Sequence, residues 1–396
     1  MPDNENSLLL DISITKETVS VMGDMPSPYS LSRYYQDKLI KEGTLPVNEL
    51  IAYGYELFNN IFSTEKRKED IRNTLSNLKD DERLTIAIRS DDPEIHNIPF
   101  EILNNSRKED GFLLKKGKIS IVRDMPAFGK KVIPARPPIR ILILLSLPLK
   151  TYEANPIDPL KELHVIYKAL SEYINSGLVE IDVEEKVNIP VVRGRLLKGH
   201  YHIVHFTGHG SEGGCLVIED EDDKKEEKRL TAEEIKNLFE GSNVSLFYFD
   251  ACETAKASPY TPSLAQHIYS GIRDSYIIAN LASVKDDLAT EATGLIYRSL
   301  FNDGRLDNTL NDVRVRLNTD WWKPVIFCSP QKRIFNLSKG VEKKHLKRAI
   351  YRPPRTIKNY VYRYGIVREA SSKIEGESNH LALHGIGGAG KSTTAV

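Results

Sequence analysis

The 396-residue sequence has little cysteine, no excess of charge of either sign and no long hydrophobic run. Three cysteines cannot build a disulfide framework and leave at least one thiol unpaired, which favours a reducing compartment and a chemical role for cysteine. Lys plus Arg and Asp plus Glu both number 55, so no global field draws the chain toward nucleic acid or anionic lipid. We therefore expect no direct nucleic-acid binding.

Membrane and secretory segments are also missing from the sequence. The longest apolar stretch, residues 141–149, is well short of the roughly 20 residues that cross a bilayer. The first residues have neither the basic region nor the apolar region of a secretory signal. We expect a cytoplasmic protein with no membrane partner, and its length predicts two to three domains at roughly 150 residues each.

Two regions of different pattern make up most of the chain. Residues 1–135 mix strand-like and helical segments, and the paired prolines Pro137 and Pro138 mark the boundary that follows. From residue 140 to about 337, short apolar runs alternate with helical segments, as in buried parallel strands with helices on both faces. The sequence therefore predicts an α/β fold, in which reactive groups gather beyond the carboxyl ends of the strands.

Two of the predicted strands end in reactive side chains. The apolar run 203–206 leads into His209, and the apolar run 244–249 leads into Asp250 and Cys252. Because the carboxyl ends of parallel strands meet at one edge of a sheet, His209 and Cys252 can be neighbours in the fold. That is the arrangement that a thiol nucleophile needs.

The chemistry of this pair is that of covalent catalysis. A cysteine attacks as the thiolate, and a nearby imidazole promotes its formation and later protonates the leaving amine. The glycines beside His209 permit close backbone approach and positive φ, so the N–H of Gly210 can join that of Cys252 in an oxyanion hole. The alternative is a buried cysteine and a turn histidine that never meet.

Longer motifs extend this pattern. A hydrophobic block that ends in His-Gly, followed by one that ends in Ala-Cys, resembles the caspase-type cysteine peptidases, and HIVHFTGHG with FYFDACETA resembles the CHAT family. PFEILNN and GFLLKKGKISIVRDMP are similar to that family's amino-terminal half, and SVKDDLATEATGLIYRSLFNDGRL with KPVIFCSP to its carboxyl-terminal signature. The resemblance implies a caspase-like parallel-sheet sandwich, with an inactive half, residues 1–135, before an active half, residues 136–337.

The resemblance also assigns site residues. It places the family's catalytic histidine on His209 and its cysteine on Cys252. Relatives often carry Asn two positions before the cysteine, whereas this chain has Asp250, as in metacaspases, where the acid lines a pocket for Arg or Lys. Asp250 thus either selects a basic P1 residue or accepts backbone N–H groups at its strand end. Asp286 matches the family's late acid and either helps to form that pocket or caps the next helix.

The last motif, residues 385–392, has the G-x-x-x-x-G-K-S pattern of a P-loop. Backbone amides from Gly385 to Gly390 would cradle phosphates, Lys391 would reach them and Ser392 would bind Mg²⁺. The motif resembles the start of the NACHT and NB-ARC type of signalling NTPase. Only four residues follow Ser392, so we expect no competent ATPase, with ATP and Mg²⁺ needed only by a complete NTPase module that also drives oligomerisation.

The remaining signals are weaker. Residues 338–364 are basic and form either a solvated linker to residues 365–396 or a patch for nucleic acid or an acidic partner. The all-charged run Glu219–Arg229 predicts a surface loop. His205, His209 and Cys215 have loose metal-ligand spacing without an apparent fourth ligand, so we expect no metal site.

Taken together, these features predict a cysteine endopeptidase that uses His209 and Cys252, needs no cofactor for proteolysis and acts on a protein substrate. The resemblance further implies the effector part of a prokaryotic antiphage immune sensor, in which an NTPase switches on the protease. The rival interpretation is a catalytically inert caspase fold that serves as a scaffold or binding module.

Overall fold

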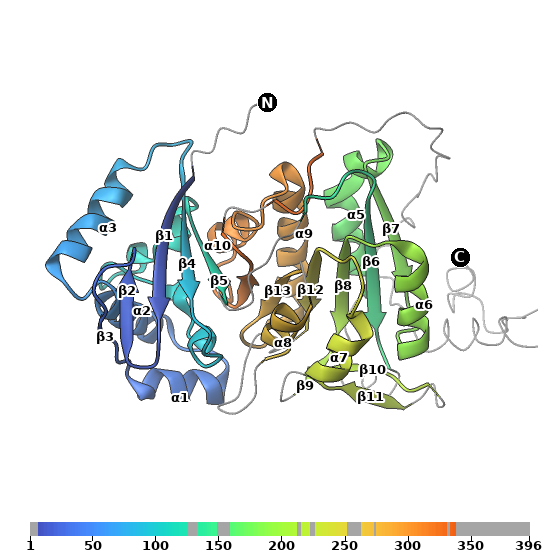
Figure 1. The fold of residues 1–396 in the computed structure, drawn as a ribbon, viewed down its shortest axis with the longest axis horizontal. Coiled ribbons are helices and arrows are strands. Elements are labelled where there is room, and N and C mark those ends of the chain that lie inside the picture. Colours follow the sequence, from blue (N-terminus) through green and yellow to red (C-terminus); the bar gives the residue numbers. More distant parts are fainter. Residues whose placement is uncertain are drawn as a thin grey trace, which may run out of the picture. The chain divides into compact units, whose positions relative to one another are not determined.

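An 11-stranded sheet forms the centre of the protein, in the order β3-β2-β1-β4-β5-β14-β13-β12-β8-β6-β7 (Figure 1). The structure is a computed structural model that describes residues 7–125, 133–148, 159–211, 215–221, 226–251, 263–272, 275–330 and 333–337. All of these residues belong to one compact unit, residues 1–350. The predicted α/β fold class with a mainly parallel sheet is therefore confirmed.

The strands follow the apolar runs of the sequence closely. In the main sheet they are β1 (Ser7–Ile14), β2 (Thr18–Val21), β3 (Ser27–Pro28), β4 (Arg83–Arg89), β5 (Ile119–Asp124), β6 (Ile139–Ser146), β7 (Val179–Glu184), β8 (Ile203–Gly208), β12 (Leu246–Asp250), β13 (Tyr276–Asn280) and β14 (Pro324–Phe327). A separate three-stranded sheet contains β9 (Gly210–Ser211), β10 (Cys215–Glu219) and β11 (Glu227–Leu230).

Helices cover the main sheet. They are α1 (Arg33–Glu42), α2 (Val47–Ile61), α3 (Glu65–Asn77), α5 (Pro159–Asn175), α6 (Ile189–Gly199), α7 (Ala232–Phe239), α8 (Leu264–Gly271), α9 (Asp286–Asp303) and α10 (Asn311–Arg316). Helices α3, α6, α7 and α8 begin at a residue whose side chain caps the helix. Capping boxes begin α7 and α8, where Thr231 and Ser263 accept backbone N–H groups. Around β8 and β12, α5 and α9 cover one face of the sheet, and α7 and α8 pack together over the other (Figure 1).

One short strand joins the two sequence regions. Strand β14 pairs antiparallel with β13 and parallel with β5, through Phe327 opposite Arg123. The predicted boundary near residue 135 falls between β5 and β6, and the sheet nevertheless continues across it. The two regions therefore share one set of backbone hydrogen bonds.

A buried ion pair explains two of the motifs in the first region. Glu101 of PFEILNN and Arg123 of SIVRD are both 0% exposed and form a bidentate pair, one arm of which measures 2.9 Å. Arg123 also donates to the carbonyl of Ile98 at 2.9 Å, and the Arg314 guanidinium lies 3.8 Å from Glu101. These motif residues therefore have a structural role: they link the segment 98–101 to β5, next to β14.

The prediction of a loop over the charged run is wrong at both of its ends. Glu219 ends β10 and is only 1% exposed, and Glu227–Arg229 belong to β11, which pairs antiparallel with β10. The N–H of Glu219 donates to the carbonyl of Val187 at 2.9 Å. Alternating contacts in a ladder can bury one charged side chain and expose the next, which composition alone does not reveal.

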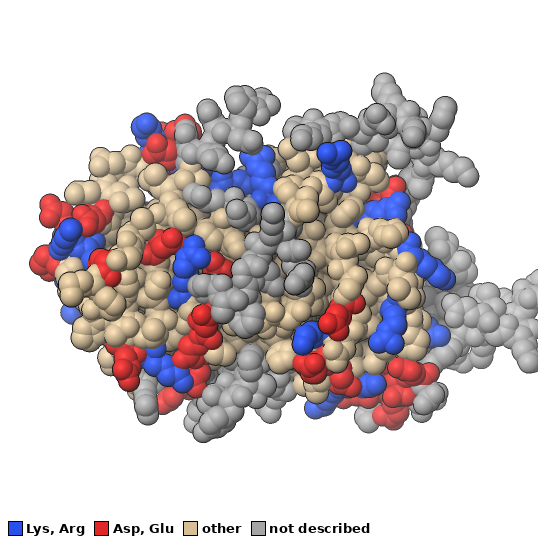
Figure 2. All heavy atoms as spheres, in the orientation of Figure 1, with Lys and Arg blue, Asp and Glu red and all other residues tan. Residues whose placement is uncertain are grey.

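Charge is mixed over the surface. Figure 2 shows acidic and basic side chains interspersed over most of the visible face, in keeping with a net charge of zero. None of the helices in the described ranges combines the length and the apolar character that crossing a bilayer requires.

Candidate active site

His209 lies at the carboxyl end of the central strands, between the end of β8 and the start of β9. It is half-buried, and its carbonyl accepts a hydrogen bond from the N–H of Val217 on β10 at 3.0 Å. Gly210, the predicted oxyanion-hole donor, pairs with Leu216 in the small sheet. The three-stranded sheet thus fixes the backbone that carries the predicted catalytic histidine.

Gly208 is needed for close packing rather than for an unusual backbone angle. A Cβ on this residue would lie 2.7 Å from the carbonyl oxygen of Ser146, inside the contact limit. Its φ is not positive, so of the two properties that glycine permits beside His209, position 208 uses the close backbone approach alone. A larger residue at position 208 would push β8 away from β6 just before His209.

Strands β8 and β12 are in register at their ends. Asp250 is the Cα partner of Thr207 in a parallel ladder. His209 follows Thr207 by two residues, and Cys252 follows Asp250 by two residues. Cys252 itself lies outside the described residues, which end on this strand at Ala251.

The Asp250 carboxyl group belongs to a polar network. It accepts hydrogen bonds from Thr293 Oγ1 at 3.2 Å and from Asn280 Nδ2 at 3.4 Å, and it shares a hydrogen bond with the Glu162 carboxyl group. Tyr248 exchanges a 2.8 Å hydrogen bond with Thr293. Asp250 is therefore held by side chains of α5, α9 and β13, and it remains only half-buried.

The two carboxyl groups retain a proton at neutral pH. Desolvation and the charge of Glu162 raise the pKa of Asp250 to about 8, and desolvation raises the pKa of Glu162 to about 7. Two carboxylates that share a site cannot both ionise easily, so they titrate as a pair. The shared proton therefore belongs to the pair as a whole.

His205 lies under this pair and stays neutral. Its Nε2 is 3.3 Å from Glu162 Oε1, its Nδ1 is 3.1 Å from the hydroxyl of Tyr297, and its ring stacks on Tyr248 with centroids 4.3 Å apart. Complete burial lowers the pKa of His205 to about 4. An imidazole this deep supports its neighbours and does not exchange protons with a substrate.

Glu162, His205 and Asp250 are also the residues of this site that could hold a cation. Their nearest ligand atoms all lie within 4.8 Å of one another. A hydrogen bond between two carboxyl groups requires a proton on one of them. We therefore interpret the cluster as a pair of acids that shares a proton and not as a cation site. His209 and Cys215, the other residues considered for zinc, are not members of this group.

Asp286 begins α9, and its negative charge raises the pKa of Glu162. The residue before it, Lys285, occupies the N-cap position and makes no side-chain capping bond. Asp286 therefore lies in the first turn, where a carboxylate interacts favourably with the helix dipole. The structure brings Asp286, Glu162 and Asp250 to the same end of the sheet as His209.

Sequence reasoning missed Glu162, Thr293 and Tyr297, which come from α5 and α9. One signal could have found the strand residues of the network. His205 and Thr207 alternate with apolar residues on β8, as Tyr248 and Asp250 do on β12, so each pair shares one face of the sheet. The P-loop, Gly385 to Ser392, and the basic segment lie outside the described residues.

Comparison with known families agrees with the motifs. The CHAT domain matches residues 57–336, which is well over half of the chain. The chain belongs to the CHAT domain family. The match includes both the ion-pair motifs of the first region and the strand ends that carry His209 and Asp250, so this CHAT domain spans both regions of the sheet.

Several solved structures are similar to the CHAT chain at low identity. The separase–securin complex of Saccharomyces cerevisiae is 14% identical with a TM-score of 0.42, over 66% of this chain and 16% of that one. The Arg-specific cysteine proteinase gingipain R is 11% identical with a TM-score of 0.49, over 83% and 78%. The complex of Porphyromonas gingivalis RgpB pro- and mature domains has 11% identity and a TM-score of 0.44, over 76% and 78%.

Identities this low carry no information about activity, and the chain spans less than a fifth of the separase chain. No curated protein matches the sequence.

Proposed function

We propose that this CHAT domain is a cysteine peptidase whose nucleophile is Cys252 and whose general base and acid is His209. The observation that supports it most is the pairing of Thr207 with Asp250, because each predicted catalytic residue follows its own member of this pair by two positions. Because the two strands are parallel and each residue lies two positions beyond the pair, His209 and Cys252 are expected at the same end of the sheet.

The proposed reaction proceeds through an acyl-enzyme. His209 takes the proton of the Cys252 thiol, the thiolate attacks the peptide carbonyl, and the backbone N–H groups of Gly210 and Cys252 stabilise the oxyanion. The carbon–nitrogen bond then breaks as the imidazolium gives its proton to the leaving amine. Water, deprotonated by His209, hydrolyses the thioester and restores the thiol.

We also propose that Asp250, with Asp286 nearby, favours Arg or Lys at P1. Asp250 ends β12 as a half-buried residue, and a cation beside its carboxyl group can replace the proton that it shares with Glu162. Because that proton must leave first, the ratio of kcat/KM for Arg over Leu at P1 is expected to rise from pH 6 to pH 8. A ratio that is flat over this range, or a wild-type preference for Leu, would contradict the specificity proposal.

A labelling experiment separates the peptidase from an inert scaffold. A peptide with a thiol-reactive electrophile should modify Cys252 in the wild type and fail to do so in His209→Ala, while His164→Ala, an exposed histidine on α5, should behave as the wild type. Cys215 and Cys328 provide internal controls, since both are free thiols. Equal labelling of Cys252 in the wild type and in His209→Ala would favour the scaffold.

Peptide hydrolysis tests the same pair by kinetics. Cys252→Ala and His209→Ala should each abolish cleavage, and the double variant should be no slower than either single variant, because nucleophile and base act as one unit. Additive losses would mean that the two residues do not work together.

The role of the peptidase in an NTPase-controlled antiphage sensor is a wider part of the proposal, supported by the P-loop motif at residues 385–392. Partners are then a protein substrate and further copies of the complete protein, in the cytoplasm. Phage challenge of bacteria that express the complete protein tests it: the wild type should reduce plaque formation, and Cys252→Ala should not. Equal plaque numbers would exclude a protease-dependent defence.

A further inference from the structure

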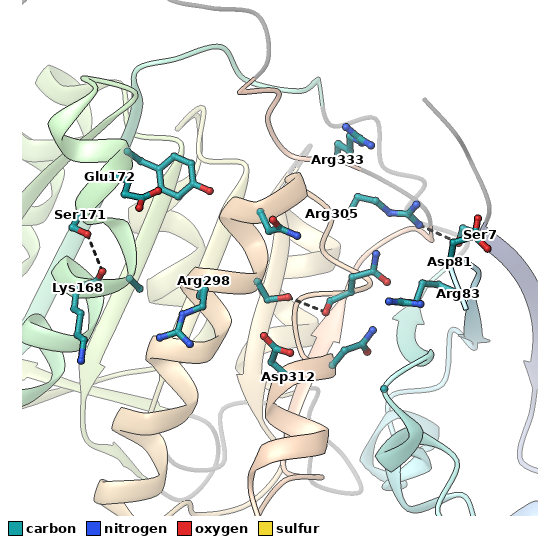
Figure 3. Close-up of a pocket in the computed structure, with 17 residues that line it drawn as sticks. Ser7, Asp81, Arg83, Lys168, Ser171, Glu172, Arg298, Arg305, Asp312 and Arg333 are labelled. Carbon is teal, nitrogen blue, oxygen red and sulfur yellow. Dashed lines mark hydrogen bonds between the residues drawn. The ribbon is translucent and has the colours of Figure 1, made fainter. Parts of the chain in front are cut away.

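A polar cavity of about 730 Å³ lies away from the candidate active site, where β1 and β4 begin and where α5 and α9 end (Figure 3). Its walls come from both regions of the sequence. Ser7 and Arg83 belong to the first region, whereas Lys168 and Arg298 belong to helices of the second. The volume is within the 300–1,000 Å³ that is usual for small-molecule sites.

Basic side chains outnumber acidic ones around this cavity. The lining contains five cations, Arg83, Lys168, Arg298, Arg305 and Arg333, and three acids, Asp81, Glu172 and Asp312. Five minus three leaves an excess of two positive charges, although the chain as a whole has none. A concave surface with such an excess raises the local concentration of anions.

Three of these cations have no carboxylate partner within the described ranges. Arg83 donates only to the backbone carbonyls of Asp80 and Glu82, at 3.1 and 3.0 Å, and no ion pair forms on Lys168 or Arg298. Arg305, in contrast, is paired with Asp307 at 2.6 Å. The cavity thus keeps basic groups available on three different elements, β4, α5 and α9.

Neutral polar groups complete the lining. Asn302, Asn308 and Asn311 offer amide donors and acceptors, and Ser299 donates to the carbonyl of Asn308 at 3.2 Å. The ring of Tyr173 also lines the cavity and offers a flat apolar surface. Such groups can orient a ligand that the basic residues attract.

We propose that this cavity binds a small molecule that carries two or more phosphate groups and has the size of a nucleotide. Guanidinium groups bind phosphate oxygens in pairs, and cations on three elements match several phosphates better than one carboxylate. The amides and the tyrosine ring suit a nucleoside attached to the phosphates.

The same two helices connect this cavity with the polar network. Lys168 follows Glu162 by six residues on α5, and Arg298 directly follows Tyr297 on α9. On each helix, the residue that lines the cavity is therefore roughly 9 Å or less along the axis from the residue that belongs to the network. A ligand that draws Lys168 and Arg298 toward Arg83 would shift the helices that contact Asp250 and His205. The rate at which Cys252 reacts should then change on binding, a consequence that rests on the proposed function.

Calorimetry on the full chain tests the binding itself. Lys391→Ala serves as the background, so that the P-loop motif does not contribute, and the probes are ATP, inorganic tripolyphosphate and orthophosphate at low salt. We expect ATP and tripolyphosphate to bind and orthophosphate to bind at least ten times more weakly. Tighter binding of ATP than of tripolyphosphate would show that the nucleoside contributes, and equal binding would show a site for the phosphate chain alone.

Matched variants locate the site. Lys168→Gln with Arg298→Gln should weaken binding of both probes at least tenfold, whereas Lys66→Gln with Arg72→Gln, two exposed cations on α3, should not. Absence of binding at millimolar concentration, or equal loss in both double variants, would overturn the cavity assignment. If binding is lost as expected but Cys252 labelling is insensitive to the ligand, the site stands and only its link to the active site fails.

Discussion

The carboxyl groups of Glu162 on α5 and Asp250 on β12 share a hydrogen bond, with His205 beneath them 3.3 Å from Glu162. Asp250 ends β12 and Glu162 lies in the first turn of α5, so both carboxyl groups are at the end of the sheet that carries His209. A pair of acids that keeps one proton near neutral pH makes this end of the sheet sensitive to pH in the range where proteins usually work.

The first prediction concerns stability. The folded pair has raised pKa values, about 7 and 8, so the folded state binds more protons than the unfolded state from about pH 4 upward. Stability contributed by this pair is therefore greatest at low pH and is lost as the pH rises to about 8. Asp250→Asn keeps the shape and cannot ionise, so it should be more stable than the wild type at pH 8, by about 1–3 kcal/mol.

Urea unfolding of both proteins from pH 5 to pH 8 measures this difference. Burial of neutral His205, whose pKa is lowered to about 4, works in the opposite direction below pH 6.5, and it differs between the two proteins because the charge of Asp250 raises the pKa of His205. The interval from pH 6.5 to pH 8 therefore decides the comparison. A difference between wild type and variant that is the same at pH 6.5 and pH 8 would exclude a shared proton.

The second prediction concerns the hydroxyl of Thr293. Its hydrogen bond to Asp250 favours the carboxylate, so Thr293→Val should raise the pKa of Asp250 further. The rise of the Arg-to-Leu P1 ratio should then move to higher pH. Thr290→Val, on the same helix and also buried, is the control and should leave the profile in place.

The third prediction concerns Gly208. An alanine here would place its Cβ 2.7 Å from the carbonyl of Ser146, so the end of β8 must move and the rate of Cys252 labelling should fall at least tenfold. Gly194, inside α6, has open space around it, and Gly194→Ala should instead stabilise the protein by up to about 1 kcal/mol. Unchanged labelling in Gly208→Ala would mean that this close approach does not position His209.

The fourth prediction concerns the buried ion pair. Glu101→Gln leaves the charges of Arg123 and Arg314 without their partner and should cost about 3–5 kcal/mol in the free energy of unfolding. Glu101→Leu combined with Arg123→Met should recover part of that loss, because no unpaired charge then remains at position 123. A loss below about 1 kcal/mol for the single variant would indicate that water reaches the pair.

Most of the fold could be predicted from local pattern. The strand-like segment ISIVRD, residues 119–124, coincides with β5, and the helical pattern of residues 159–174 coincides with α5 except for one additional residue at its end. The alternation of apolar strands with helices indicates that both faces of the sheet are buried. This pattern can be read from residues that are neighbours in the sequence. The antiparallel placement of β14 could not be predicted, because a four-residue apolar run contains nothing about direction.

The site could be predicted only where it lies on strand ends. Asp250 directly follows an apolar run and His209 comes three residues after one, so both could be predicted from the sequence. Glu162 looks like an ordinary helix acid, and its burial depends on how α5 packs against α9 and β8, contacts that arise between distant parts of the chain. The hairpin at Glu219 and Glu227 was missed for a similar reason, since pairing with a partner strand decides which charges are covered.

The position of β14 also affects how the protein folds. β14 separates β5 from β13, so neither region can complete its hydrogen bonding before a segment near the end of the described chain arrives. Until then β5 and β13 are open edges, which are prone to pair with other chains. Contacts between residues so far apart in sequence form slowly, because loop closure precedes any gain from pairing. Expressed alone, the first region would keep β5 as an open edge strand and the second would keep β14 as one, so each region covers the edge strand of the other.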